Sequence, residues 1–361
     1  MLVILAIITG SSLNSMKTKA AILVKHNEPL QIIDDIEIPA LKRGQVLVKI
    51  FYTGICHSQL MEINGLRGDD PWLPHMLGHE ATAKVIELGE DVSTVSVDDI
   101  VILSWIKGSG IDAGGAKYKH GKQIINAGAV TTFSEYAVVS ENRCTKMPEH
   151  LPMDIACLLG CAVMTGYGAV ANTLKPSSGK SIAIFGLGGI GLSSLVAAIY
   201  HKMYPIITID INDEKLELAK SLGATHIINS NKDDPIERIY EICDGGVDYS
   251  LDASGLVKVI EQAFKSVQRE KGFCLFASHP PQGDKIKIDP FDLICGKRIQ
   301  GTWGGECLPD NDIPKIAKLY KEGLINLDFF ISEYYSLDTI NDGINALMDK
   351  KENRAIVKIT D

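Results

Sequence analysis

The chain has 361 residues, a formal net charge of −9, 45% hydrophobic residues and eight cysteines. This length exceeds one ordinary hydrophobic core and predicts two domains. The acidic balance argues against nucleic acids and anionic membranes as partners. The cysteines lack the spacing of a disulfide framework, which indicates a protein of the reducing cytoplasm.

The first nine residues, Met1 to Thr9, are almost entirely apolar. The run is too short to span a bilayer, and no basic segment precedes it as in a signal peptide. We therefore expect residues 1–15 to be a non-essential extension, with a hydrophobic arm that packs on the body or on a partner as the alternative.

Short apolar runs separated by Gly and Pro follow, as is typical of strands in a mostly antiparallel β domain. They cover Ala20–Val24, Gln45–Ile50, Ala83–Leu88 and Ile100–Leu103. Residues 107–122 are rich in glycine and lysine, and we expect them to form a loop.

From about Gly166 the pattern changes to alternating strands and helices. The expected strands are Ile182–Phe185, Ile206–Ile209, His226–Ile228, Tyr249–Ala253 and Phe273–Ala277, with helices from Ile190 and over Asp213–Leu222. Such alternation predicts an α/β domain built on a doubly wound parallel sheet.

The first of these strands runs into a glycine-rich turn that contains Gly186, Gly188, Gly189 and Gly191. A GxGxxG match between a strand and a helix indicates a dinucleotide-binding turn. The second strand ends at Asp210, about 20 residues further on, where a carboxylate that binds the ribose 2′-hydroxyl is expected. The alternative is that the glycines form only a tight turn, but the strand, the spacing and the carboxylate together favour cofactor binding.

Cys56, His79 and Cys161 supply two thiols and one imidazole from three separate segments. Three protein ligands leave the fourth position of a tetrahedral zinc site open, as a catalytic site requires. The spacing alone is weak, because buried thiols and core histidines are common. Cys157 stands four residues before Cys161 and could share a helix face with it; we expect it to be a packed thiol.

Several ordered motifs give the chain a resemblance to the zinc-dependent alcohol dehydrogenases of the medium-chain dehydrogenase/reductase family, most of all to the glutathione-dependent formaldehyde dehydrogenase branch. It extends from Met16 to Ile359. The motifs that carry it are residues 54–58 (GICHS), 77–80 (LGHE), 132–136 (TFSEY), 158–168 (LLGCAVMTGYG) and 244–248 (DGGVD).

The resemblance implies a GroES-like catalytic domain at 16–164 and 304–361, and a Rossmann domain that binds NAD at 165–303. It also implies a homodimer, or a tetramer built from dimers, joined through the edge of the cofactor-domain sheet.

The resemblance also assigns roles to single residues. Cys56, His79 and Cys161 match the catalytic zinc ligands, and Glu80 matches a carboxylate that faces the metal from behind. Ser58 matches the hydroxyl that takes the alcohol proton. The cofactor contacts that it implies are His57 and Arg354 near the pyrophosphate, Lys215 near the adenosine ribose and His279 near the nicotinamide; Trp105 is expected to line the substrate pocket.

The chain also departs from the family. Relatives hold a second, structural zinc with four cysteines after the strand at 100–103, but here no cysteine lies between Cys56 and Cys144. We therefore expect one catalytic zinc per chain and no structural zinc. Gln59 replaces an Asp that binds the zinc-ligating histidine, so a neutral acceptor is expected there. Met61 replaces a proton-relay histidine.

These features predict an enzyme that transfers hydride reversibly between a small-molecule alcohol and NAD. A polyol or sugar-alcohol dehydrogenase of the same family is one alternative, because Gln59, Met61 and the rewritten loop imply a different pocket. A cofactor-binding protein without turnover is the other. Since Met61 cannot titrate, His57 is a candidate to carry the proton onward.

Overall fold

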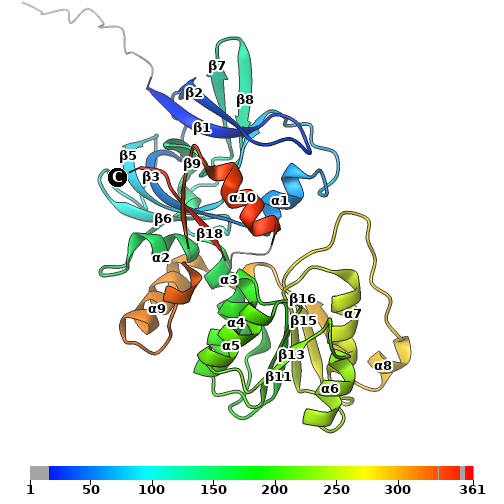
Figure 1. The fold of residues 1–361 in the computed structure, drawn as a ribbon. Coiled ribbons are helices and arrows are strands. Elements are labelled where there is room, and N and C mark those ends of the chain that lie inside the picture. The colour runs from blue at the N-terminus through cyan, green and yellow to red at the C-terminus, as the bar shows by residue number, and fades with distance from the viewer. Residues whose placement is uncertain (1–15, 332, 350–353, 361) are drawn as a thin grey trace, which may run out of the picture.

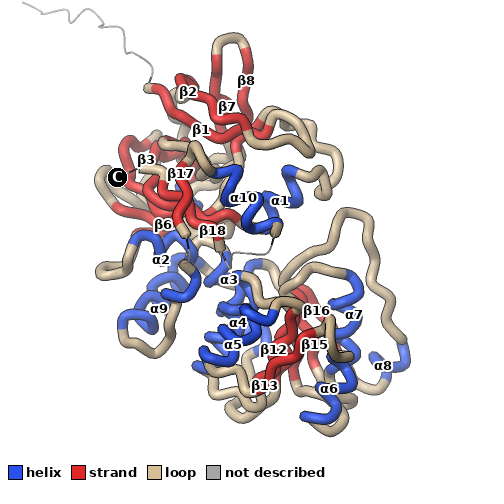
Figure 2. Tube along the Cα trace, in the orientation of Figure 1, coloured by secondary structure: helices blue, strands red, loops and turns tan. Residues whose placement is uncertain are grey.

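The computed structural model describes residues 16–331, 333–349 and 354–360. The expectation for residues 1–15 lies outside this part of the chain. Figure 1 shows two bodies, one rich in β-structure and one in which helices cover both faces of a sheet. Figure 2 shows the same division, with most strands in the first body.

The first body contains a barrel and a sheet, and most strand pairs in both are antiparallel. A closed barrel has the strand order β1-β2-β7-β8-β4. Its strands are β1 (Lys17–Leu23), β2 (Gln31–Glu37), β4 (His75–Met76), β7 (Ala116–His120) and β8 (Gln123–Ala127). The sheet beside it has the order β10-β6-β5-β3-β18-β17, with β9 also paired to β3.

The central strand of that second sheet is β3 (Gln45–Ile55), which carries partners along both edges. The other strands are β5 (Glu80–Leu88), β6 (Ile100–Ser104), β9 (Tyr136–Ser140), β10 (Cys144–Lys146), β17 (Tyr334–Ser336) and β18 (Ala355–Lys358). Because β18 pairs antiparallel with β3, the end of the chain returns to the first body.

The second body is built on a six-stranded sheet of order β13-β12-β11-β14-β15-β16, and every pair in it is parallel. Its strands are β11 (Ile182–Phe185), β12 (Ile206–Asp210), β13 (His226–Asn229), β14 (Tyr249–Asp252), β15 (Phe273–Phe276) and β16 (Arg298–Gly301). This strand order is that of a Rossmann sheet. Successive strands are added on one side of β11 as far as β13, and from β14 onward they are added on the other side.

Helices cover both faces of this sheet because β11 is apolar on both sides. Ile182 and Ile184 pack into the cluster that includes α4 (Gly189–Tyr200) and α5 (Asp213–Leu222). Ala183 and Phe185 point to the other face, toward α6 (Pro235–Ile242) and α7 (Val257–Ser266). A strand buried on both faces reads as a continuous apolar run, which is why the sequence predicted it.

The remaining helices connect or flank the two bodies. They are α1 (His57–Ile63), α2 (Met153–Leu158), α3 (Ala162–Gly168), α8 (Pro290–Ile294), α9 (Pro309–Lys321) and α10 (Ile340–Met348), with short helical segments η1 (Glu141–Arg143), η2 (Ala169–Leu174), η3 (Gly304–Glu306) and η4 (Asp328–Phe330). The predicted fold class is confirmed by this architecture. The predicted domain limits, 16–164 with 304–361 and 165–303, stay predictions.

One sequence expectation was wrong, and one possibility left open by the sequence is excluded. Residues 107–122 are not loop throughout, because Ala116–His120 forms β7 and pairs with β8. Within β7, Ala116 and Tyr118 are buried while Lys117 and Lys119 are exposed, a two-residue period that the lysine-rich composition concealed. Cys157 and Cys161 do not share a helix, since α2 ends at Leu158. Cys157 is nevertheless fully buried, as expected of a packed thiol.

Candidate active site

Cys56, His79 and Cys161 each occupy the end of a regular element, which is how distant segments reach one point. Cys56 follows β3 in extended conformation and is the N-cap residue of α1. His79 directly precedes β5, and Cys161 is the N-cap residue of α3. Side chains at such junctions project from the ends of the sheet and helices, so the fold brings the three together.

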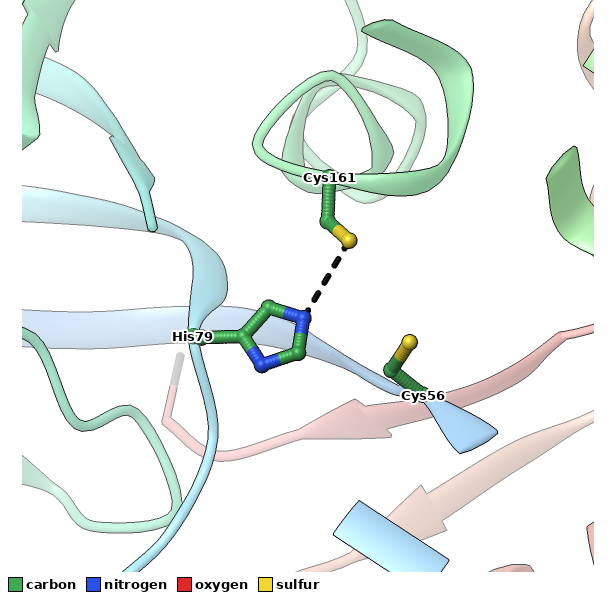
Figure 3. Close-up of side chains that lie close together, drawn as sticks. All are labelled: Cys56, His79 and Cys161. Atoms are coloured by element: carbon green, nitrogen blue, oxygen red, sulfur yellow. Dashed lines mark hydrogen bonds between the residues drawn. The ribbon is translucent and has the colours of Figure 1, made fainter. Parts of the chain in front are cut away.

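The three side chains converge closely enough for one metal ion. In the described part of the chain they are the one group of three such residues whose ligand atoms all lie within 4.8 Å of one another. His79 Nε2 lies 3.2 Å from Cys161 Sγ, and the Cys56 thiol points toward both (Figure 3). Zinc bonds of 2.0–2.3 Å in tetrahedral geometry place N and S about 3.6 Å apart. The donor types and the 3.2 Å separation of His79 Nε2 and Cys161 Sγ therefore fit zinc.

The two thiols differ in acidity. A hydrogen bond from Cys161, together with the nearby charge of Arg354, holds the pKa of the Cys56 thiol well below its ordinary value. The same hydrogen bond and burial raise the pKa of Cys161. Zinc would bind thiolates, and Cys56 is the thiol whose surroundings favour that form.

Glu80 and Arg354 form a buried ion pair directly behind His79. Both side chains are nearly inaccessible to solvent. Arg354 Nε donates to Glu80 Oε1 at 2.9 Å, Nη2 donates to the same oxygen, and the Ala162 N–H donates to Oε2 at 3.3 Å. Burial raises the pKa of the Glu80 carboxyl against the opposing effect of Arg354. The resemblance assigned Glu80 to the metal site and Arg354 to the cofactor pyrophosphate, whereas in the structure the two side chains bind each other.

Gln59 lies between two of the predicted ligands. Its Oε1 accepts from the Cys56 N–H at 2.8 Å, and its Nε2 contacts His79 Nδ1. The expectation that Gln59 offers an acceptor to the histidine was wrong: the acceptor end is taken by Cys56, so the donor end faces the ring. Gln59 stands at the third helical position of α1, where a Gln commonly bonds back to the N-cap residue.

The glycine-rich turn has the shape that a pyrophosphate requires. Gly186 has φ +89°, a conformation that favours glycine, and a Cβ on Gly191 would lie 1.8 Å from Gly186 O. A Cβ on Gly188 would meet no atom within 4 Å, which leaves open space beside the N-terminus of α4. A Cβ on Gly189 would lie 3.7 Å from Arg354 Nη1. A helix N-terminus with a nearby guanidinium suits an anion.

The predicted ribose contacts lie beside this turn. Asp210 ends β12, and its carboxylate accepts from the backbone N–H of Leu187 at 2.7 Å and from those of Ile211 and Asn212. A carboxylate has about four acceptor positions, so one remains for a hydroxyl. Lys215 lies half-buried in the first turns of α5, and His279 is exposed beyond β15. The glycine-rich turn and Asp210 therefore fit a dinucleotide.

Two hydroxyls near the three ligands are buried without a hydrogen-bond partner in the described structure: Ser58 Oγ and Thr165 Oγ1. Ser58 lies in the first turn of α1, two residues after Cys56, while His57 beside it is exposed. Buried hydroxyls are normally satisfied, so an unpaired one indicates a place for a ligand atom. Thr165 was missed by the sequence analysis; its position one helical turn after Cys161 was the available signal.

Trp105 follows β6 at the end of the strand pair that is preceded by His79. In the antiparallel pair of β5 and β6, Glu80 is opposite Ser104, so the residue before Glu80 and the residue after Ser104 are neighbours. The Ser104 hydroxyl also donates to Gly160 O at 2.7 Å, next to Cys161. Trp105 meets Trp303 edge to face, with ring centroids 4.9 Å apart. An aromatic pair therefore lies at the end of β6 that is opposite the start of β5.

Comparison with known proteins shows the family of this chain. An alcohol dehydrogenase GroES-like domain matches residues 42–149, and a zinc-binding dehydrogenase domain matches residues 189–322. The chain is 34% identical to an S-(hydroxymethyl)glutathione dehydrogenase of Photobacterium damsela subsp. piscicida, over 95% of this chain and all of the relative. It is 33% identical to an alcohol dehydrogenase class-3 of Dictyostelium discoideum, over 94% of this chain and 97% of the relative.

Solved structures agree with this assignment. Benzyl alcohol dehydrogenase from Acinetobacter calcoaceticus superimposes with a TM-score of 0.87 at 30% identity, over 96% of this chain and all of that one. A 2R,3R-butanediol dehydrogenase from Bacillus subtilis gives 0.76 at 28% identity, over 94% and 99%. Both folds therefore cover nearly the whole molecule.

The chain thus belongs to the zinc-dependent alcohol dehydrogenases of the medium-chain dehydrogenase/reductase family. Within that family it lies near the formaldehyde dehydrogenase branch. The predicted function, a zinc- and NAD-dependent alcohol dehydrogenase, is confirmed over the polyol dehydrogenase and the non-catalytic alternatives. Among the described residues, no helix is both long and apolar enough to cross a membrane.

Proposed function

We propose that Cys56, His79 and Cys161 hold one catalytic zinc ion per chain, and that Ser58 takes the proton of the alcohol. The observation that carries this proposal is the convergence of the three ligand atoms within 4.8 Å, close in sequence to the unpaired, buried Ser58 hydroxyl. When bound, zinc supplies a Lewis acid at the alcohol oxygen and NAD supplies a hydride acceptor.

The protein's own residues then orient the reactants and move the proton. Oxidation removes a hydride from the alcohol carbon and a proton from its oxygen. Ser58 Oγ receives that proton and must release one in turn, because a hydroxyl carries only one acidic hydrogen. His57 is exposed and adjacent to Ser58, so it is the proposed next acceptor, with contact to the cofactor pyrophosphate as its alternative role.

The cofactor is proposed to bind at the glycine-rich turn. Gly186, Gly188, Gly189 and Gly191 accommodate the pyrophosphate at the N-terminus of α4, and Arg354 faces it from the catalytic body. Asp210 selects NAD, since its carboxylate would repel a 2′-phosphate. Lys215 and His279 are the proposed contacts to the adenosine ribose and the nicotinamide.

Glu80 is proposed to act through Arg354 and His79. Its carboxylate neutralises the guanidinium in a site that excludes water, and it keeps Arg354 aimed at Gly189. A buried pair that loses one member leaves an uncompensated charge, so Glu80 and Arg354 depend on each other.

The proposed substrate is a small alcohol with an apolar or aromatic substituent that packs on Trp105. This assignment is supported by the edge-to-face pair of Trp105 and Trp303 at the end of β6, opposite the start of β5, which His79 precedes. Among the structural neighbours, one is a benzyl alcohol dehydrogenase, which accords with such a pocket.

We propose that a carboxylate, in place of a structural zinc, organises the segment after β6. Glu141 is buried and accepts hydrogen bonds from the N–H groups of Ser93, Thr94 and Ile111 at 2.7–2.9 Å. From the other side, the Ser109 N–H donates to Asp310 at 2.6 Å. Side-chain carboxylates thus bond this segment from two sides, which supports the proposal of one zinc per chain.

The proposed assembly is a dimer or a tetramer of dimers joined at β16. This strand forms one edge of the six-stranded sheet, and Phe291, Leu293 and Ile294 of α8 are exposed. An exposed edge strand with nearby apolar side chains favours pairing with a second copy. We also propose a cytoplasmic location, since the eight cysteines of the described chain are unpaired thiols.

Metal analysis and a substrate panel test this function. Purified enzyme is expected to contain about one zinc per chain and to reduce NAD with benzyl alcohol. The panel includes ethanol, sorbitol and S-hydroxymethylglutathione. About two zinc ions per chain would contradict the single-site proposal. Turnover of S-hydroxymethylglutathione in preference to benzyl alcohol would contradict the aromatic pocket.

A further inference from the structure

Gln59 is enclosed between two residues of the metal site, and only 1% of it is exposed. Its primary amide has two unlike ends, an oxygen that accepts and a nitrogen that donates hydrogen bonds. One end faces the backbone N–H of Cys56 and the other faces Nδ1 of His79. The amide can therefore satisfy both neighbours only if His79 accepts at Nδ1.

The backbone fixes which way the amide points. The Cys56 N–H can only donate, and it lies 2.8 Å from Gln59 Oε1. Rotating the amide by half a turn would place the NH₂ group against this N–H, with two donors facing each other in a buried space. A donor left unsatisfied in a buried space is strongly unfavourable. The nitrogen end of Gln59 is thus directed at His79.

This orientation decides the proton position on the imidazole. A neutral imidazole carries one proton, and Nδ1 must be bare to accept from the Gln59 NH₂ group. The proton then lies on Nε2, which points at Cys161 Sγ from 3.2 Å. Nε2 is also the ring nitrogen nearest the thiols, and it must lose its proton to bind zinc.

We propose that Gln59 is a positioning residue that holds His79 in the tautomer with the proton on Nε2 and thereby weakens zinc binding at this site. The inference rests on the proposed zinc ligands. A carboxylate at position 59 has the opposite effect, because both of its oxygens accept: one from the Cys56 N–H and one from a protonated Nδ1. The family's usual carboxylate therefore favours the ring state that zinc needs, whereas Gln59 opposes it.

The first test measures the tautomer directly in zinc-free enzyme labelled with ¹⁵N-histidine. The His79 signals are assigned by their loss in His79→Gln. The expected spectrum shows a bare Nδ1 and a protonated Nε2, and Gln59→Glu moves the proton to Nδ1. A protonated Nδ1 in the unaltered protein would overturn the inference.

The second test measures zinc affinity by competition with a chromophoric chelator. Gln59→Glu keeps the length of the side chain and is expected to tighten zinc binding about 10–100-fold, the usual effect of a partner to a metal-bound histidine. Gln45→Glu is the matched control, since Gln45 is an equally buried amide at the far end of β3, and its zinc affinity should stay within about twofold of the unaltered protein.

The outcomes separate this inference from the proposed function. If Cys161→Ser leaves zinc binding unchanged, the proposed ligand set fails, and the inference fails with it. If Cys161→Ser abolishes zinc binding but Gln59→Glu binds zinc no more tightly than the unaltered enzyme, the zinc site stands and the role of Gln59 is overturned. Equal tightening by Gln45→Glu would show a general effect of charge and would also overturn it.

Discussion

Neutralising Glu141 should destabilise the segment after β6, which includes residues 107–113. Oε1 of Glu141 accepts from the N–H groups of Ser93 and Thr94, and Oε2 accepts from that of Ile111. In Glu141→Gln the amide oxygen can accept from the N–H groups of Ser93 and Thr94, but the amide NH₂ group then faces the N–H of Ile111. The substitution removes the charge from two hydrogen bonds, which destabilises the fold by about 1 kcal/mol each. It also leaves the Ile111 N–H without an acceptor, which costs about 1–3 kcal/mol. We expect a total loss of about 3–5 kcal/mol.

The contribution of Glu141 should also depend on pH. Burial raises its pKa, but the hydrogen bonds from Ile111, Ser93 and Thr94 together hold it below the ordinary value. A group with a lowered folded-state pKa stabilises the protein fully above its unfolded pKa, about 4.3 for Glu, and the effect is lost as the pH falls through the folded-state pKa. The difference between the unaltered protein and Glu141→Gln should therefore shrink below about pH 4.3.

Urea unfolding and amide hydrogen exchange of residues 107–113 measure these effects, with Glu87→Gln as a control that makes the same charge change at an exposed position. Gly110→Ala should weaken the same segment, because its Cβ would lie 2.7 Å from the Glu141 carboxyl carbon at φ +98°. Equal stability of Glu141→Gln and Glu87→Gln would refute the reasoning. Loss of protection at 107–113 on treatment with a chelator would show that a metal holds the segment after all.

Three further results are expected. Cys161→Ser should lose zinc and activity while unfolding cooperatively; retention of about one zinc per chain would exclude Cys161 as a ligand. Asp210→Ser should reduce the preference for NAD over NADP by at least about tenfold, measured as the ratio of kcat/KM values, and an unaltered enzyme that uses both equally would contradict the role of Asp210. His57→Gln should lower the oxidation rate more at about pH 6–7 than at about pH 9, where hydroxide replaces the base, and Met61→His should partly restore it; a pH profile parallel to that of the unaltered enzyme would remove His57 from the proton path.

The cofactor fold could be predicted because its signals are local. Ile182–Phe185 is a continuous apolar run, and the structure makes it β11 with the same limits. Asp213–Leu222 carries an Asn N-cap and a following Gly223, and α5 has these limits too. Each signal depends on neighbours in sequence, so no knowledge of the whole fold was needed to place these elements.

The hairpin of β7 and β8 could not be predicted because its signals are not local. Only Ala116 and Tyr118 face inward along β7, and a strand this short shows too few alternations to outweigh its lysines and flanking glycines. Its pairing with β8 inside the barrel gives those two residues a core to enter. Long-range pairing, which the sequence does not display, decided the element.

The sequence predicted the candidate residues: two thiols, an imidazole and a hydroxyl in recognisable motifs, and a glycine turn followed by Asp210. Tertiary structure alone decided how they are connected. It paired Glu80 with Arg354 across 274 residues and turned the donor end of Gln59, not the acceptor end, toward His79. The identity of a side chain fixes the bonds it can make, but its partners and the direction of each hydrogen bond follow from the positions of groups far apart in the chain.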